Sequence, residues 1–247
     1  MSKIAVALSL VLACVSIARA DEKDEVGKAS KKATEMPSYA FKVALELEGV
    51  PWANGPIEFT GAFNRDTATY VKGEVMGQEF EAYRRGEKTV VKRDGEWQLS
   101  ERGGGRGMGM MSRALKSPHD ELKDMEKRFK EVKKGEKKTI DGKECIAYEG
   151  DLTAEGLKDL LPMGRGMQNM GDTEMSGKAK VWIDEEGTLR RYEITANVSF
   201  SFQGNPVEMK IARAIDLTGI GDTKVEVPKE VADLFEKKEE KKDEEKR

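Results

Sequence analysis

Apolar and polar residues alternate along most of this chain, and a period of two is the period of a β-strand. In residues 39–47 (YAFKVALEL) and 192–202 (YEITANVSFSF), nearly every second side chain is a large apolar one. Because successive side chains of a strand point to opposite faces of the sheet, such segments bury one face and expose the other. Similar segments recur over residues 57–99 and 178–217. The pattern predicts about ten or eleven strands.

Short turns join these strands in sequence order. Asp94-Gly95 and Asp141-Gly142 are the residue pairs that favour two-residue hairpin turns, in which both central residues have positive φ. Strands joined in this way form an antiparallel meander, and a sheet with this many strands curls. We therefore expect a mainly β (α+β) fold, a curved antiparallel sheet or half-barrel.

Two segments have the helical period instead. The first begins at Ser117-Pro118, an N-cap residue followed by proline at the first helical position, and ends at Gly135. Its apolar residues are Leu122, Met125, Phe129 and Val132. The second begins after Thr153 and carries Leu157, Leu160 and Leu161. We expect these two short helices to cover the concave face of the half-barrel.

The first twenty residues have the layout of a secretory signal peptide. Lys3 precedes an apolar run from Ile4 to Ile17, and Ala18-Arg19-Ala20 is an A-x-A-like cleavage site. Lipidation of Cys14 is the less favoured alternative, because the apolar run before it is short. We expect cleavage near Ala20 and a periplasmic or secreted protein.

The mature chain divides into three parts. Residues 21–37 are polar and are expected to form a flexible N-terminal arm, either mobile or a frayed helix. Residues 38–235 form a single half-barrel domain, and residues 236–247 form a charged disordered tail without apolar residues. Loss of Lys3 and Arg19 removes two positive charges from a net charge of −3 and leaves −5, which argues against a nucleic-acid partner.

The sequence offers little for catalysis. It has one histidine, His119, and Cys145 is the only cysteine after the signal peptide. Neither lies in a recognisable nucleophile–base context, and there is no P-loop or zinc-protease motif. We expect a non-enzymatic protein without a cofactor, in which Cys145 is a small buried residue of a strand.

Two segments pair glycine with methionine around an arginine. They read GGGRGMGMM at 103–111 and LPMGRGMQNM at 161–170. Methionine is a flexible side chain that adapts to varied apolar partners, and its sulfur is also a soft metal ligand. Three interpretations remain open: an adaptable apolar lining, ordinary loop or core residues, and a methionine-based Cu(I) site.

Four segments together resemble a known superfamily. They are DGEW at 94–97, IDGKECIAYEG at 140–150, VWIDEEGTLRRYEI at 181–194 and VEVPKEV at 225–231. Their strand and turn pattern is similar, over about residues 38–231, to the periplasmic lipoprotein carriers of the LolA/LolB and LppX-like superfamily. That resemblance implies an open half-barrel whose concave apolar face, covered by helices, receives acyl chains.

The resulting hypothesis is an exported binding protein that holds a lipid or a lipoprotein acyl chain in the concave face, as a carrier. A membrane-bound delivery or acceptor protein would be a second partner. The alternatives are a methionine-rich Cu(I)-binding protein and a structural or assembly factor without a ligand. The residues expected to line the ligand site are Met108, Met110, Met111, Leu122, Met125, Phe129, Leu157, Leu160, Met163, Met167 and Met170.

The signal peptide gives a first prediction. Protein recovered after export should begin at Asp21 and carry no acyl group, because Ala18-Arg19-Ala20 directs cleavage after Ala20. Intact-mass spectrometry measures this directly. A mass that matches a chain starting at a diacylated Cys14 would contradict the prediction and make the protein membrane-tethered.

Overall fold

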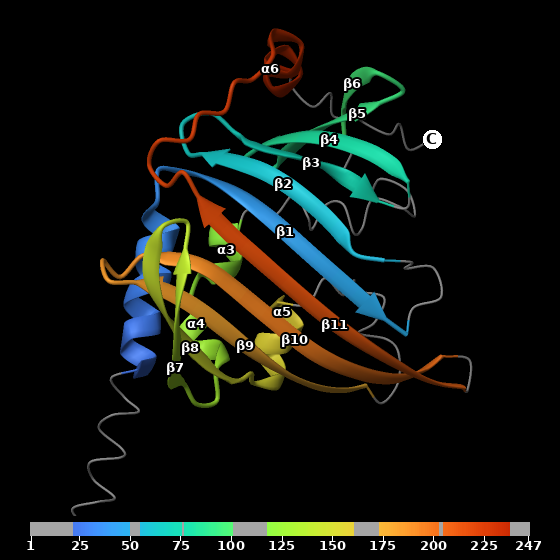
Figure 1. The fold of residues 1–247 in the computed structure, drawn as a ribbon. Helices are drawn as coiled ribbons and strands as arrows, with labels where there is room; N and C mark the ends of the chain where they lie inside the picture. Colours follow the sequence, from blue (N-terminus) through green and yellow to red (C-terminus); the bar gives the residue numbers. More distant parts are fainter. Residues whose placement is uncertain are drawn as a thin grey trace, which may run out of the picture.

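A computed structural model of the chain describes residues 22–49, 55–75, 77–100, 118–160, 173–202 and 205–237. These residues form an antiparallel sheet of eleven strands (Figure 1). The strands are β1 Ser38–Glu48, β2 Ile57–Asn64, β3 Thr69–Val75, β4 Gln78–Arg85, β5 Lys88–Arg93, β6 Glu96–Leu99, β7 Lys133–Ile140, β8 Lys143–Asp151, β9 Glu174–Asp184, β10 Leu189–Phe202 and β11 Asn205–Thr218. The predicted curved, mainly β fold is confirmed.

The order of the strands places β6 and β7 at opposite edges of the sheet. The order is β6-β5-β4-β3-β2-β1-β11-β10-β9-β8-β7, so the first and last strands of the chain pair at its centre. Consecutive strands β6 and β7 are thus ten strand spacings apart, about 48 Å if the sheet were flat. The connection between them contains helices α3 (Pro118–Leu122) and α4 (Met125–Arg128), and it carries both onto the concave face.

Both predicted hairpin turns are present. Asp94 and Gly95 have φ values of 52° and 86° between β5 and β6, and Asp141 and Gly142 have values of 50° and 73° between β7 and β8. Positive φ at both central residues is the geometry whose twist matches that of the flanking strands.

Residues 22–35, expected as a mobile arm or a frayed helix, form a helix. This N-terminal helix (residues 22–35) buries Val26, Ala29, Ser30 and Ala33, which lie at positions i, i+3, i+4 and i+7 and so form one stripe. The stripe is made of small residues, which let the helix lie close to the rest of the cover. The helix is also tied by Lys23, whose Nζ donates to the Phe129 carbonyl at 3.0 Å.

The helix predicted from Pro118 to Gly135 is broken. It begins at Pro118, but α3 ends at Leu122 and α4 begins at Met125, because Asp124 adopts a left-handed conformation (φ 56°). Residues 133–140, including Gly135, belong to β7. Ser30 of the N-terminal helix compensates the break: its hydroxyl donates to the Leu122 carbonyl and accepts the Met125 N–H at 3.2 Å.

Two more helices complete the described fold. Helix α5 (Ala154–Leu160) joins α3, α4 and the N-terminal helix over the concave face (Figure 1). Helix α6 (Lys229–Glu236) packs on the convex face, where its Val231 and Phe235 form a buried cluster with Tyr83 and Val90 of the sheet. In the described ranges, no helix has the length and apolar character needed to cross a membrane.

The predicted tail overlaps the end of this helix. Glu236 is the last residue of α6, and Lys88 Nζ donates to the carbonyl of Lys237 at 2.7 Å. Residues 238–247, the rest of the predicted tail, lie outside the described residues, as do residues 1–20 of the predicted signal peptide.

The bridging role of Ser30 can be tested by removing its hydroxyl. Ser30→Ala leaves the Leu122 carbonyl and the Met125 N–H without their partner in a buried place, so the free energy of unfolding should fall by about 1–3 kcal/mol. Urea denaturation measures this. The control is Thr34→Ala, since the Thr34 hydroxyl bonds only to Lys31 within the same helix. Equal losses for the two variants would contradict the bridging role.

Candidate functional site

The concave face of the central strands is apolar except at Arg213 of β11. Strand register places side chains of neighbouring strands in rows across this face. One row consists of Val43, Ile215, Tyr192 and Val181. Two rows further along the strands lie Leu47, Ile211, Ala196 and Gly177. All of these side chains except Leu47 and Gly177 belong to the buried residues of one large hydrophobic cluster, and Leu47 packs against it half-buried.

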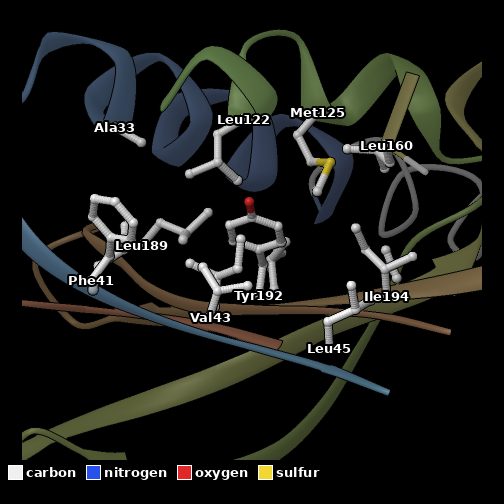
Figure 2. Packing of buried hydrophobic residues seen from close by; sticks show 14 of the residues in the cluster. Ala33, Phe41, Val43, Leu45, Leu122, Met125, Leu160, Leu189, Tyr192 and Ile194 are labelled. Carbon is white, nitrogen blue, oxygen red and sulfur yellow. The ribbon is translucent and has the colours of Figure 1, made fainter. Parts of the chain in front are cut away.

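The helices close this surface from above. Figure 2 shows Leu122, Met125 and Leu160 projecting from the helical layer toward the sheet. Five predicted ligand-lining residues lie in this interface, each no more than 2% exposed: Leu122, Met125, Phe129, Leu157 and Leu160. The structure therefore brings these five together as packed core. The other six, Met108, Met110, Met111, Met163, Met167 and Met170, lie outside the described residues.

Helix α5 approaches the sheet at a glycine. A Cβ atom added to Gly177 of β9 would lie 2.7 Å from Leu157 Cδ2 and 2.6 Å from the Thr195 carbonyl oxygen. Real Cβ atoms do not come so near other heavy atoms, so only glycine allows Leu157 to occupy this position. The contact fixes where the helical cover begins along β9.

Beyond this contact the apolar face is less covered. The next row toward the β10–β11 hairpin contains Met209, Val198 and Met175, and the row after it contains Phe200 and Val207. Met175, Phe200, Val207 and Met209 are half-buried, as is Leu47 on β1. We call Leu47, Met175, Phe200, Val207 and Met209 the outer apolar rows. Their partly exposed side chains continue the buried surface without a polar interruption.

A carboxylate is buried in the middle of the covered face. Glu121 of α3 accepts a hydrogen bond from the Tyr192 hydroxyl at 2.5 Å and an ion-paired one from Arg213 Nη1 at 2.7 Å, all through its Oε2 atom. The side chains of Glu121 and Arg213 are 7% and 9% exposed, and Tyr192 is fully buried. We call Glu121, Tyr192 and Arg213 the buried triad. It is the polar link between the sheet and α3.

Burial and the neighbouring charge set the protonation of Tyr192 and Arg213. Burial raises the pKa of the Tyr192 hydroxyl well above its ordinary value, and the Glu121 carboxylate raises it further. Burial alone would lower the pKa of the Arg213 guanidinium, but the nearby Glu121 carboxylate holds it above its ordinary value. Tyr192 therefore remains a donor and Arg213 remains a cation throughout the physiological range.

Sequence reasoning missed the triad, although one signal pointed to it. Arg213 falls in the apolar phase of β11, between Ile211 and Ile215. A charged residue at an inward position requires a buried partner. The alternation in β11 therefore indicates that Arg213 has a buried partner of opposite charge. The identity of the partner could not follow from the same signal, since Glu121 lies 92 residues earlier.

The polar convex face carries a separate groove of about 710 Å³. Lysines and acids alternate along it, including Glu149, Asp151, Lys178, Lys180 and Glu193. Two of them form an ion pair, with Lys180 Nζ 3.0 Å from Glu149 Oε2. Such a lining is unsuited to an apolar ligand, so the candidate site is the covered concave face and not this groove.

Cys145 has the structural role that the sequence indicated. It lies in β8, is fully buried and packs with Ala147 and Trp182. Burial raises the pKa of its thiol, which disfavours the reactive thiolate. Within the described ranges, no group of three or more His, Cys, Asp and Glu side chains could hold a metal ion.

Comparison with solved structures identifies the fold. The crystal structure of LprF from Mycobacterium bovis aligns over 85% of this chain and 97% of its own, with a TM-score of 0.52 and 13% sequence identity. The lipoprotein LppX from Mycobacterium tuberculosis aligns over 84% of this chain and 98% of its own, with a TM-score of 0.51 and 17% identity. The predicted resemblance is confirmed at the level of the fold, which is that of LppX and LprF.

The other comparisons do not extend the identification of the fold. A LolA superfamily protein from Nitrosomonas europaea covers 87% of this chain and 96% of its own at 9% identity, but its TM-score of 0.32 is too low to support an argument. No protein-family model matches the sequence, and no curated protein matches it.

The buried triad predicts a contrast between two ion pairs. Arg213→Met leaves the Glu121 carboxylate buried without its cation, so it should lower the free energy of unfolding by about 3–5 kcal/mol. Lys42→Met breaks an exposed ion pair, in which Lys42 Nζ is 2.9 Å from Glu58 Oε2. It should lower the free energy of unfolding by less than about 1 kcal/mol. Urea denaturation compares the two. A loss for Arg213→Met as small as that for Lys42→Met would show that the triad does not hold α3 to the sheet.

Proposed function

We propose that this protein is an exported, non-enzymatic binding protein that holds an apolar ligand, a lipid or a lipoprotein acyl chain, in the concave face of its half-barrel. The observation that carries the proposal is the partial exposure of the outer apolar rows. They extend the buried face beyond the helical cover and leave five apolar side chains half-buried in a continuous strip.

The strip has the chemistry of an acyl-chain site. Its side chains are aliphatic, thioether or phenyl groups, and the strip contains no charged residue that would have to be dehydrated. Fully burying one such side chain contributes about 1.5–3 kcal/mol. Completing the burial of five half-buried ones would contribute several kcal/mol, which is enough for measurable binding after the cost of ordering the ligand.

Methionine at two of the five positions suits a ligand of variable shape. Met175 and Met209 flank Val198 from the two neighbouring strands. Their unbranched side chains can change rotamer to fit different chains, while β10 between them stays fixed. The six methionines outside the described residues are proposed to extend this adaptable lining, as the sequence predicted.

The fold and the sequence support the same proposal from separate directions. The chain has the half-barrel of LppX, which is itself a lipoprotein, and its first twenty residues have the layout of a signal peptide. We propose that the protein works outside the cytoplasm and exchanges its ligand with a membrane or with a membrane-bound partner.

The outer apolar rows can be tested by making them polar. The triple variant Met175→Gln, Phe200→Gln, Met209→Gln should bind a fluorescent fatty-acid methyl ester at least about tenfold more weakly than wild type, because it replaces apolar contact surface with amides that lose water on binding. Fluorescence titration measures the affinity, and thermal melting confirms that the variant is folded.

The control is Leu234→Gln, which makes polar a partly buried apolar residue of α6 on the convex side. It should leave probe affinity unchanged. If the triple variant binds the probe as well as wild type does, the outer apolar rows are not the site. Tight binding of Cu(I) by wild type, together with weak binding of the probe, would instead support the methionine-based copper hypothesis.

A further inference from the structure

The buried triad has the composition of a carboxylate-binding site. An arginine and a tyrosine hydroxyl converge on one carboxylate oxygen, at 2.7 and 2.5 Å, inside an otherwise apolar face. Charged hydrogen bonds of this kind are the strong ones, and arginine has a planar set of five N–H donors that can hold a carboxylate through two parallel bonds. In this structure the carboxylate belongs to the protein itself.

The two sides of the triad differ in how firmly they are placed. Tyr192 and Arg213 lie on β10 and β11, two strands of 14 residues that pair with each other and each with a further neighbour. Glu121 lies on α3, a helix of 5 residues. A helix this short is not stable alone and depends on its contacts. The sheet therefore provides a preformed receptor, and α3 provides the group that can be exchanged.

Helix α3 presents a pair of groups that mimic an amphiphile. Glu121 supplies the carboxylate, and the adjacent Leu122, fully buried, supplies a branched alkyl group beside it. Figure 2 shows Leu122 above Tyr192, whose hydroxyl points from the sheet toward the helices. A fatty acid whose head replaced Glu121 could place its first carbons where Leu122 packs now.

The remaining distance fits a long alkyl chain. From Arg213, alternate residues of β11 lead through Ile211 and Met209 to Val207 at the outer apolar rows. The six residue steps from Arg213 to Val207 along this antiparallel strand span about 20 Å, comparable to an extended long-chain fatty acid. Among the described residues, the inward side chains of β11 along this path are apolar, so the strand offers polar contacts to the ligand at Arg213, the inner end.

We propose that Tyr192 and Arg213 form the head-group site for a fatty acid, and that Glu121 occupies this site when no ligand is bound. The inference rests on the proposed function and adds the chemical class of the ligand. Exchange of one carboxylate for another keeps Arg213 paired. A neutral head group that displaced Glu121 would leave the buried guanidinium without its counter-charge, which is strongly unfavourable.

The test compares palmitic acid with methyl palmitate on the full chain, each measured by displacement of the fluorescent methyl ester. Glu121→Gln removes the competing charge and keeps the shape of the side chain. It should tighten binding of the acid at least about tenfold, and it should change binding of the ester by less than about twofold. Asp184→Asn is the matched control, because Asp184 is a buried carboxylate paired with Arg190 at 2.7 Å outside the triad. It should change neither affinity.

A second variant covers the case in which Glu121→Gln does not fold. Tyr192→Phe removes one hydroxyl from the receptor and should weaken binding of the acid several-fold, with the ester unchanged. The inference is overturned if a folded variant leaves the ratio of acid to ester affinity as it is in wild type. If wild type binds neither the acid nor the ester, the proposed function fails as well, so the two failures can be told apart.

Discussion

A single sheet supplies almost all of the regular structure described here, so its apolar concave face can be buried only by segments of the same chain that cross it. The strand order provides such a segment, because β6 and β7 are consecutive in sequence but lie at opposite edges. The chain between them carries α3 and α4 over the concave face, and the N-terminal helix packs beside both. This crossing supplies α3 and α4, and the N-terminal helix and α5 complete the cover of the candidate site.

The cover is held by a few specific contacts and not by its own helical stability. Helices α3, α4 and α5 have 5, 4 and 7 residues, lengths at which isolated helices do not form. Apolar side chains of the helices, such as Leu122 and Met125, pack against the sheet. Ser30 and Arg213 form hydrogen bonds with polar groups of the helices. The helices of the cover therefore keep their structure only while they are in contact with the sheet and with one another.

The parts of the fold that could be predicted from the sequence depend on local signals. Alternation along β1, β10 and β11 and the turns at Asp94-Gly95 and Asp141-Gly142 each involve neighbouring residues, and all appear where predicted. The N-terminal helix was predicted only as a frayed alternative to a mobile arm, because its buried stripe of Val26, Ala29 and Ala33 has no large side chain. The break at Asp124 depends on Ser30, more than 90 residues away, and no local pattern could reveal it. Leu122, Met125, Leu157 and Leu160 lie in the helices of the cover, as the sequence predicted, and their role in lining a ligand site stays a prediction. The triad was not found, because it joins residues 71 and 92 positions apart.

The central claim is that the concave face holds an aliphatic lipid, and native mass spectrometry of the exported protein tests it most directly. Protein purified from the cells that export it, without detergent, should carry one lipid per chain, and denaturation should release that lipid for identification. A chain that shows only its own mass, and takes up no fatty acid or ester when these are added, would contradict the account. So would a chain that carries copper in place of a lipid.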